Sequence, residues 1–336
     1  MRYLSAALLA LSLTAVSAQD VNSSQDGVLA TGTMGSTNPP SPTMKAGDAG
    51  SNARLLSVNS IDDFCIFGPK EANKTIGDTE EEQVAWCTQP RNDARLIPDG
   101  TFTGVHFITT PFYVQVVGWG DLTKIGLQDA DYGGELDPHG ATGEGNPIGG
   151  NVTSNVSGTD ENYAEWMEFI SYEQFCLRVC TAGNDTWDAA TMCEHKLDEM
   201  GCGFIMPGDY EQKDVFQSCD ADAAYPPGMF SVAGDGDNSF SSFAQRYTGT
   251  LTQEGQQTVY TIGDTATPSS AQMTPSSSNC RTQSSLNAAQ QPTSTSSNEG
   301  DEGSKGQSQD DDSAAATLQL VSAWSIAVIA VIAVLL

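Results

Sequence analysis

The clearest alternation of apolar and polar positions lies in residues 101–119, which are rich in Thr, Val, Ile and Phe. Successive side chains of a strand point to opposite faces of a sheet, so this alternation predicts β-structure. Pro111 interrupts the run, because proline lacks the amide hydrogen that a central strand needs. We therefore expect two strands, or one bent edge strand, around residues 101–120.

A second pattern has helical spacing. Its apolar positions, separated by three and four residues, are Tyr163, Trp166, Met167 and Ile170. Positions with this spacing lie on one face of a helix. The Ser-x-x-Gln order at Ser171 and Gln174 fits a capping box for a further helix through Cys176 and Cys180.

Residues 188–200 are another helical candidate, with Gly201 as the expected C-terminal stop. The patterns together predict the fold class α+β. They indicate a single disulfide-stapled domain with strands around 101–120 and helices around 161–201, flanked by disordered segments.

Polar stretches of low complexity flank these elements. Residues 265–297 contain 16 Ser or Thr in 33 positions, a composition that cannot bury enough apolar surface to fold. In an exported chain it is typical of an O-glycosylated stalk. The predicted organisation is a disordered leader over 19–53, a cysteine-rich folded domain over 54–230 and a disordered stalk over 231–303. Within the domain, the eight glycines of residues 133–158 indicate an exposed loop.

The N-terminal 18 residues predict a signal peptide. Arg2 supplies a positive start, an apolar stretch too short to span a bilayer follows, and Val16-Ser17-Ala18 is a small-residue cleavage site. We expect export from the cell.

The C-terminal segment predicts a glycosylphosphatidylinositol (GPI) attachment signal over residues 304–336. Small residues, a polar spacer and an apolar tail follow one another in the order that such signals require. The candidate attachment residues are Gly303, Ser304 and Ser313. A plain transmembrane tail is the alternative, disfavoured because no Lys or Arg lies beyond Lys305 to flank it.

The chain is strongly acidic. It carries 14 Lys+Arg against 43 Asp+Glu, a formal charge of −29. Nucleic-acid binding rests on clustered Lys and Arg, so we expect no nucleic-acid partner. Residues 54–230 alone hold 30 acidic against 9 basic residues, so the charge belongs mainly to the predicted domain. Such an acidic surface fits a self-repelling coat on a cell.

An even number of cysteines in an exported chain predicts disulfides. The cysteines are Cys65, Cys87, Cys176, Cys180, Cys193, Cys202, Cys219 and Cys280. Cys65 and Cys87 would close a loop in the N-terminal part of the domain. Cys193 and Cys202 bracket a predicted helical segment and are expected partners.

The other four cysteines leave more than one pairing open. Cys176 and Cys180 would lie one helical turn apart, so we expect them to bridge to different places. Cys280 stands inside the predicted stalk. It either folds back to Cys219 or pairs between chains.

N-glycosylation is predicted at five sequons, because each Asn is followed two residues later by Ser or Thr without an intervening Pro. They are Asn22, Asn73, Asn151, Asn155 and Asn184.

The three histidines are weak candidates for catalysis. His106 lies in a predicted strand, where a satisfied interior histidine is expected. His139 lies in the glycine-rich loop as a turn residue. His195 has helical spacing to Asp198 and Glu199, which favours a local hydrogen bond.

Other sequence patterns that could form a metal or catalytic site are disfavoured or incomplete. A zinc site of Cys193, His195 and Cys202 is disfavoured, because an oxidising compartment favours disulfides. Asp129-x-Asp131 resembles a calcium loop but lacks later ligands of an EF-hand. No Gly-x-Ser-x-Gly elbow is present. We expect no catalytic residues, no cofactor and no metal, and therefore no enzyme.

Several cysteine-anchored blocks occur together in order. They are DDFCIFGP (62–69), DPHGA (137–141), FCLRVC (175–180), CEHKLDEMGC (193–202) and MPGDY (206–210). In these blocks the domain resembles a family of fungal secreted glycoproteins labelled "macrofage (macrophage) activating glycoprotein". The resemblance implies a signal peptide, a cysteine-rich core, a Ser/Thr-rich tail and often a GPI signal. It carries no catalytic residues.

These features predict a GPI-anchored extracellular glycoprotein of the cell surface or cell wall, with a structural, adhesive or recognition role. Its expected partners are the membrane, through the GPI lipid, and cell-wall glucan or host receptors. The alternative is an anchored protein that binds or remodels wall polysaccharide. In that case sugar-stacking faces could come from Trp86, Trp119, Trp166 and Trp187, although burial in the core is the expected state of tryptophan.

Overall fold

The computed structural model of this 336-residue chain describes residues 27–232, 239–253 and 256–287. The predicted signal peptide, the predicted GPI signal and Asn22 lie outside these ranges, as do Gly303, Ser304 and Ser313. Among the described residues, no helix has the length and apolar character needed to cross a membrane.

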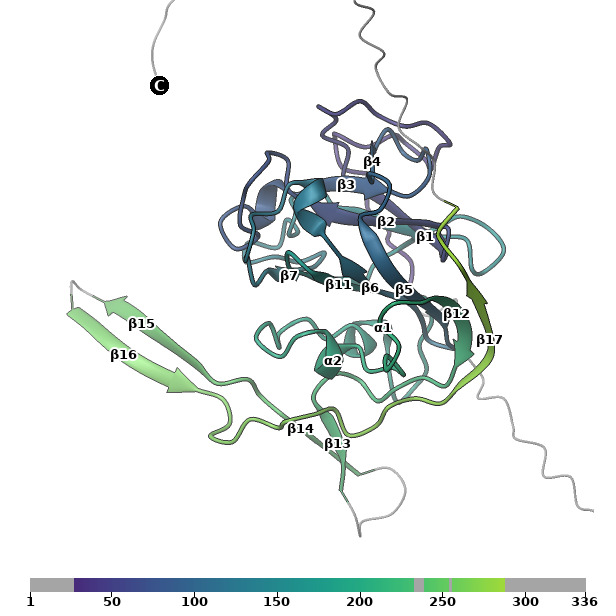
Figure 1. Cartoon of the computed structure of the whole chain (residues 1–336). Helices are drawn as coiled ribbons and strands as arrows, with labels where there is room; N and C mark the ends of the chain where they lie inside the picture. The colour runs from purple at the N-terminus through teal and green to yellow at the C-terminus, as the bar shows by residue number, and fades with distance from the viewer. Residues whose placement is uncertain (1–26, 233–238, 254–255, 288–336) are drawn as a thin grey trace, which may run out of the picture. The chain divides into compact units, whose positions relative to one another are not determined.

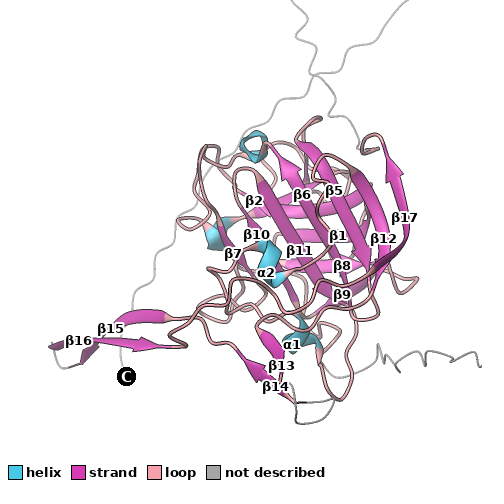
Figure 2. Cartoon of the chain, turned by 60° about the horizontal axis from the view of Figure 1, so that its bottom comes forward, coloured by secondary structure: helices cyan, strands magenta, loops and turns pink. Residues whose placement is uncertain are grey.

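The predicted strands at residues 101–120 are confirmed as β5 (Phe102–Thr109) and β6 (Tyr113–Gly120). They lie at the centre of a seven-stranded sheet, in the order β17-β12-β5-β6-β11-β10-β7. Figure 2 shows β5, β6 and β12 side by side, with β17 at the outer edge. The other strands are β7 (Gly134–Leu136), β10 (Trp166–Ile170), β11 (Gln174–Cys180), β12 (Phe216–Ala221) and β17 (Ser277–Gln283).

A second sheet of six strands has the order β4-β3-β2-β1-β8-β9. Its strands are β1 (Leu55–Ser60), β2 (Asp63–Gly68), β3 (Val84–Cys87), β4 (Arg95–Leu96), β8 (Asn151–Ser154) and β9 (Glu161–Tyr163). Most neighbouring strands are antiparallel, but β1 runs parallel to β8, and β3 to β4. Figure 1 shows β1, β2 and β3 adjacent to one another.

The main core lies between the inner faces of the two sheets. The Phe64 ring of β2 lies 5.8 Å from the Phe175 ring of β11, and Phe67 lies 5.2 Å from Trp166 of β10. Gly118 of β6 pairs directly with Phe175 and leaves room for its ring. Aromatic rings that meet in this way bury a large apolar area, so these contacts join the two sheets.

The helices predicted around 161–201 are wrong for most of that range. Residues 161–180 form β9, β10 and β11. In the part of the chain that the structure describes, helical structure is limited to short segments: α1 (Ala189–Met192), α2 (Cys202–Ile205) and two 3-10 turns, η1 (Glu80–Glu82) and η2 (Leu122–Ile125). Every residue of β10 is buried, and a strand buried on both faces has no alternation that distinguishes it from a helix. The fold is therefore mainly β, not α+β.

The supposed capping box closes a hairpin instead. The Ser171 amide donates to the Gln174 carbonyl at 2.8 Å, and the Ser171 hydroxyl donates to the same oxygen. This turn joins β10 to β11, which pair antiparallel.

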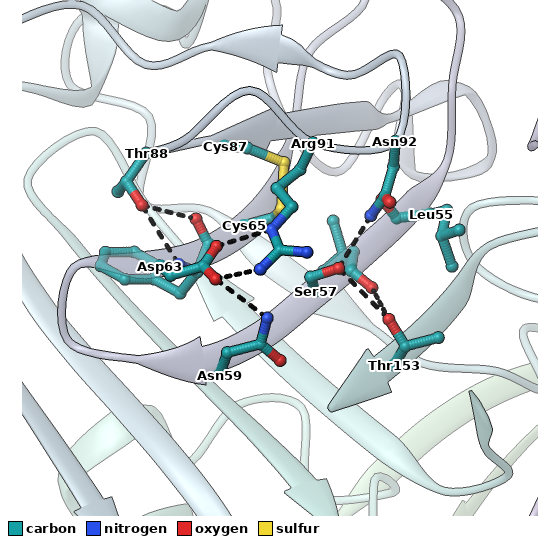
Figure 3. Close-up of a disulfide and its surroundings, with 12 residues drawn as sticks. Leu55, Ser57, Asn59, Asp63, Cys65, Cys87, Thr88, Arg91, Asn92 and Thr153 are labelled. Atoms are coloured by element: carbon teal, nitrogen blue, oxygen red, sulfur yellow. Dashed lines mark hydrogen bonds and ion pairs between the residues drawn. A yellow bond between two sulfur atoms is a disulfide. The ribbon is translucent and has the colours of Figure 1, made fainter. Parts of the chain in front are cut away.

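The predicted Cys65–Cys87 disulfide is present between β2 and β3, where the two residues face each other directly (Figure 3). Beside it, the guanidinium of Arg91 makes a two-pronged ion pair with Asp63. Asn59 also donates to the Asp63 carboxylate, at 3.0 Å. Covalent and polar contacts therefore hold this end of the six-stranded sheet together.

The ordered fold extends beyond residue 230, where the sequence predicts a stalk. Strand β17 pairs antiparallel with β12, and Cys280 bonds to Cys219 across this pair. The intrachain alternative for Cys280 is thus the observed one. Two-stranded ribbons lie between these strands along the chain: β13 (Met229–Ser231) with β14 (Phe240–Ser242), and β15 (Tyr247–Gln253) with β16 (Gln256–Ile262). On the N-terminal side, Val28 is buried and residues 28–30 bond to residues 162–164.

Candidate functional site

The outer face of the seven-stranded sheet is covered by the segment 181–210, which contains α1 and α2 (Figure 1). Two disulfides fasten this covering segment to β11: Cys176–Cys202 and Cys180–Cys193. The expected Cys193–Cys202 pairing is wrong. Alternate residues of β11 point to the same face, so Cys176 and Cys180 both reach the covering segment. They bridge to different places, as the sequence predicts, but from a strand.

A fully buried arginine lies beneath the covering segment. Arg178 projects from β11 on the same face as the two cysteines and donates to Gln115 at 2.9 Å and to the Met192 carbonyl at 3.0 Å. Its guanidinium lies 4.0 Å from the centre of the Tyr113 ring. The bond to Gln115 lies within the sheet, between β11 and β6, whereas the bond to the Met192 carbonyl joins the sheet to the covering segment.

An acidic cleft opens where the end of β7 meets the covering segment. Its volume is about 830 Å³, the size of a small-molecule site. The charged residues that line it are Glu80, Glu135, Asp137, Glu194, His195, Lys196 and Asp198. Apolar walls come from Leu197, Met229, Phe243 and Ile262.

Three side chains converge in this cleft: Glu135 in β7, Asp137 just after it, and His195 in the loop that follows α1. One donor atom from each lies within 4.8 Å of the others. Glu135 and Asp137 share a face because they are two residues apart in an extended segment. His195 is brought over them by the Cys180–Cys193 bond two residues earlier.

Asp137 is held ionised. Burial opposes its charge, but hydrogen bonds outweigh burial and lower its pKa to about 2. The donors are His195, whose Nδ1 lies 3.5 Å from Oδ2, and the backbone amides of His139 and Gly140. Gly140 has a φ of +57°, a conformation that favours glycine, and this turn aims both amides at the carboxylate. The ion pair in turn raises the pKa of His195, although burial opposes this.

The pKa of Glu135 is displaced in the opposite direction. It is only 7% exposed, and its pKa is raised well above the usual value by burial and then by the charge of Asp137. Its Oε1 is buried with no hydrogen-bond partner among the described residues. Two carboxyl groups two residues apart thus have pKa values displaced in opposite directions.

Asn146 and Glu80 complete the floor of the cleft. The Asn146 backbone pairs with Asp137, while its Nδ2 donates to Glu80 at 2.9 Å and to the Glu135 carbonyl at 3.2 Å. The Asn146 Oδ1 is buried and, within the described part of the chain, has no partner. Burial raises the pKa of Glu80, against the effect of the bond from Asn146.

The other histidines have structural partners. The His139 ring stacks on His195, with centroids 4.9 Å apart, and its Nε2 lies 2.9 Å from a Glu165 carboxylate oxygen. His106 is the interior histidine that the sequence predicts, with Nε2 2.8 Å from the Gln212 carbonyl. His195 does not make the expected local bond to Asp198 or Glu199 but meets Asp137, 58 residues earlier in the chain.

The residues of the two metal-site patterns considered from the sequence make other contacts in the structure. The sulfurs of Cys193 and Cys202 are in separate disulfides, so they cannot join His195 around zinc. In the Asp129-x-Asp131 stretch, the Asp131 oxygens accept from the amides of Ile76 and Gly133. These bonds brace a loop.

The described sequons differ in how exposed they are, and so do the four candidate tryptophans. Asn73 and Asn155 are exposed, whereas Asn151 and Asn184 are half-buried and use Oδ1 as a hydrogen-bond acceptor. Trp119 and Trp166 are buried, and Trp86 and Trp187 pack against the core. None of these four tryptophans lines the acidic cleft.

Sequence reasoning missed Glu80, Glu135, Asp137 and Asn146. A usable signal was present in Glu135-x-Asp137, two carboxylates with strand spacing beside His139. The partner His195 could not be assigned to them, because the disulfide that positions it was paired differently in the prediction.

Two curated proteins of Mycosarcoma maydis are similar to this chain. "Appressorium protein ROW2" is 45% identical over 179 residues, which are 52% of this chain and 60% of the relative. "Appressorium protein ROW1" is 46% identical over 185 residues, 54% of this chain and 42% of the relative. The chain thus spans about half the length of the curated relatives it matches.

No family model and no solved structure matches the chain. The two relatives are fungal, in line with the resemblance to fungal secreted glycoproteins, but neither bears the macrophage-activating label. The chain is therefore similar to appressorium proteins of a fungus.

Proposed function

We propose that this protein is a GPI-anchored glycoprotein of the fungal cell surface or wall, whose disulfide-stapled head binds partners and does not catalyse a reaction. The observation that carries this proposal is that all eight cysteines form four disulfides. Such a density of bridges is typical of proteins that fold in an oxidising, exported environment. The similarity to fungal appressorium proteins supports a role at the surface or in infection.

The role proposed for the head is structural, adhesive or recognition. Exposed Asn73 and Asn155 support glycosylation, because a glycan acceptor must face solvent. The acidic cleft offers a concave site with fixed polar groups, the usual form of a ligand site. Cell-wall glucan and host receptors are the proposed partners, besides the membrane lipid of the anchor.

Release from living cells tests the anchor. Phosphatidylinositol-specific phospholipase C should free the protein from intact fungal cells. A variant with Gly303→Pro, Ser304→Pro and Ser313→Pro should be secreted without treatment. Protein that resists both phospholipase and chemical extraction from wall glucan, while staying with the cell, would contradict anchoring by GPI.

A second function, remodelling of wall polysaccharide, is favoured by one observation. The pKa of Glu135 is raised while that of Asp137 is lowered to about 2, and glycoside hydrolysis uses a proton donor together with an ionised carboxylate. The separation argues against this function, because glycosidases hold the two carboxyl groups about 5 Å or more apart, whereas these donor atoms lie within 4.8 Å. The discriminating assay is turnover of β-glucan and chitin by the purified protein, with Glu135→Gln and Asp137→Asn as loss variants and the exposed Glu211→Gln, outside the cleft, as the matched control. Turnover lost only in the first two variants would replace the binding role with an enzymatic one.

A further inference from the structure

The convergence of Glu135, Asp137 and His195 has the dimensions of a metal centre. Their donor atoms lie within 4.8 Å of one another. A divalent ion with bonds of about 2.0–2.4 Å can join ligands up to about 4–5 Å apart. The three donors can therefore close on one ion with little movement of the backbone.

Two buried oxygens in the cleft lack partners. Glu135 Oε1 and Asn146 Oδ1 make no hydrogen bond to any described residue, and each side chain is 7% exposed. An unsatisfied buried polar atom costs about 1–3 kcal/mol, so in folded proteins such an atom is generally satisfied by water, an ion or a ligand. Asn146 Oδ1 is an acceptor, Glu135 Oε1 is one when the carboxyl is ionised, and both residues line the same cleft. What satisfies them must be a cation or a hydrogen-bond donor.

We propose that Glu135, Asp137 and His195 bind one divalent transition-metal ion of the Zn²⁺ or Mn²⁺ class, with Asn146 Oδ1 as an adjacent oxygen ligand. An imidazole among the donors favours these ions over Mg²⁺ and Ca²⁺, which take oxygen ligands. Three protein side chains leave further coordination positions open toward the cleft.

The surrounding contacts suit this role. The amides of His139 and Gly140 fix the Asp137 carboxylate, and the His139 ring stacks on His195 and limits its rotation. Glu165 in turn holds His139 through Nε2. Groups that orient metal ligands in this way typically change affinity by about 10–100-fold when removed. Glu80 and Asp198 add negative charge to the same cleft, which attracts a cation.

Direct titration tests the proposal. The full-length protein, purified from a fungal host and stripped with chelator, is titrated with ZnCl₂ or MnCl₂ alone by calorimetry, and bound metal is counted by mass spectrometry after dialysis. We expect one ion per chain, and a loss of affinity of at least about tenfold in His195→Ala and Asp137→Asn. Glu211→Gln removes an exposed charge outside the cleft and should change the affinity less than threefold.

Glu135→Gln separates a ligand from a structural residue. Replacing a buried carboxyl that lies beside the charge of Asp137 with a neutral amide should raise the melting temperature of the metal-free protein, while the additional rise on adding metal should disappear. A melting temperature that falls without metal and still rises normally with metal would show that Glu135 is structural.

Binding that is absent, that exceeds one ion per chain without saturation, or that weakens equally in Glu211→Gln would overturn the metal site. Because these measurements use the metal alone, they are independent of whether the protein is anchored or binds glycans.

Discussion

At the scale of single residues, Glu168 is an unusual element of the core. It projects from β10 between the two sheets, is completely buried, and accepts a hydrogen bond at 2.9 Å from the Phe67 amide in the opposite sheet. Its second oxygen, Oε1, has no partner among the described residues. Burial raises its pKa well above the usual value, although the bond from Phe67 opposes this.

This shift gives stability a pH dependence with a definite sign. Above the unfolded pKa of about 4.3, the unfolded state loses the Glu168 proton while the folded state keeps it, so Glu168 lowers the free energy of unfolding as the pH rises. We expect the stability of Glu168→Gln relative to wild type to increase from pH 4 to 7, by up to about 1.4 kcal/mol per pH unit. Urea denaturation at each pH measures the difference, and the exposed Glu211→Gln serves as the control. A difference independent of pH would contradict the assigned shift.

Gly118 is a second residue with a testable effect. A Cβ atom at this position would lie 2.3 Å from the ring of Phe175, which is fully buried. Overpacking of this kind costs about 1–3 kcal/mol, so Gly118→Ala should lower the free energy of unfolding by that amount.

Gly77→Ala is the matched control for Gly118→Ala, because no atom lies within 4 Å of the added Cβ and its φ is not positive. Urea denaturation of both variants should show a loss only for Gly118→Ala. Equal effects would mean that the loss is conformational and not steric.

Residue-scale predictions from the sequence succeeded where the environment is local. The sequence predicts that His106 is buried and hydrogen-bonded, because a histidine inside an alternating strand generally is, and the structure confirms this. The Asp137–His195 pair could not, because it depends on the chain path between positions 58 residues apart. Nothing in the local sequence encodes that path.

At the scale of elements, the covering segment depends on its two disulfides and on Arg178. The Cys176–Cys202 and Cys180–Cys193 bonds span 26 and 13 residues. Loops of this size stabilise by about 2–4 kcal/mol each. Opening them should release the segment locally before the sheets separate.

Hydrogen exchange tests this dependence. In Cys180→Ala/Cys193→Ala, amides of the covering segment should exchange at least about tenfold faster than in wild type, while those of β5 and β6 stay protected. Cys65→Ala/Cys87→Ala is the control, because that bond lies within the other sheet. Faster exchange throughout the molecule in the first variant would show that the segment and the sheets unfold as one unit.

The elements also show where sequence patterns are ambiguous. Residues 102–120 alternate and were identified correctly as strands, whereas Trp166–Ile170 has apolar residues facing both the main core and the covering segment. Tyr163, Trp166, Met167 and Ile170 then match helical spacing by coincidence. Only the knowledge that another layer covers the outer face would have identified β10 as a strand.

At the scale of the whole molecule, the fold closes with a strand far along the chain. Strand β17 extends the seven-stranded sheet by pairing with β12, and the Cys219–Cys280 bond spans 61 residues. A secreted form of residues 19–230 should therefore be less stable and less well expressed than residues 19–287. Thermal melting followed by circular dichroism compares the two forms.

The comparison of the two forms has an internal control. The longer form carrying Cys219→Ala and Cys280→Ala retains β17 but loses its bond, and should melt between the others. Equal melting temperatures for all three would show that the strand adds nothing to the stability of the fold.

The residue at which β17 ends also sets the length of chain between the folded head and the proposed anchor. With the proposed anchor at Ser304, only 21 residues separate the sheet edge at Gln283 from the lipid, a reach of at most about 75 Å. A stalk that began at Phe230 would reach about 265 Å by the same measure. With the proposed anchor at Ser304, the head would stay within about 75 Å of its own membrane. A partner outside the cell would then have to cross the cell wall to bind it.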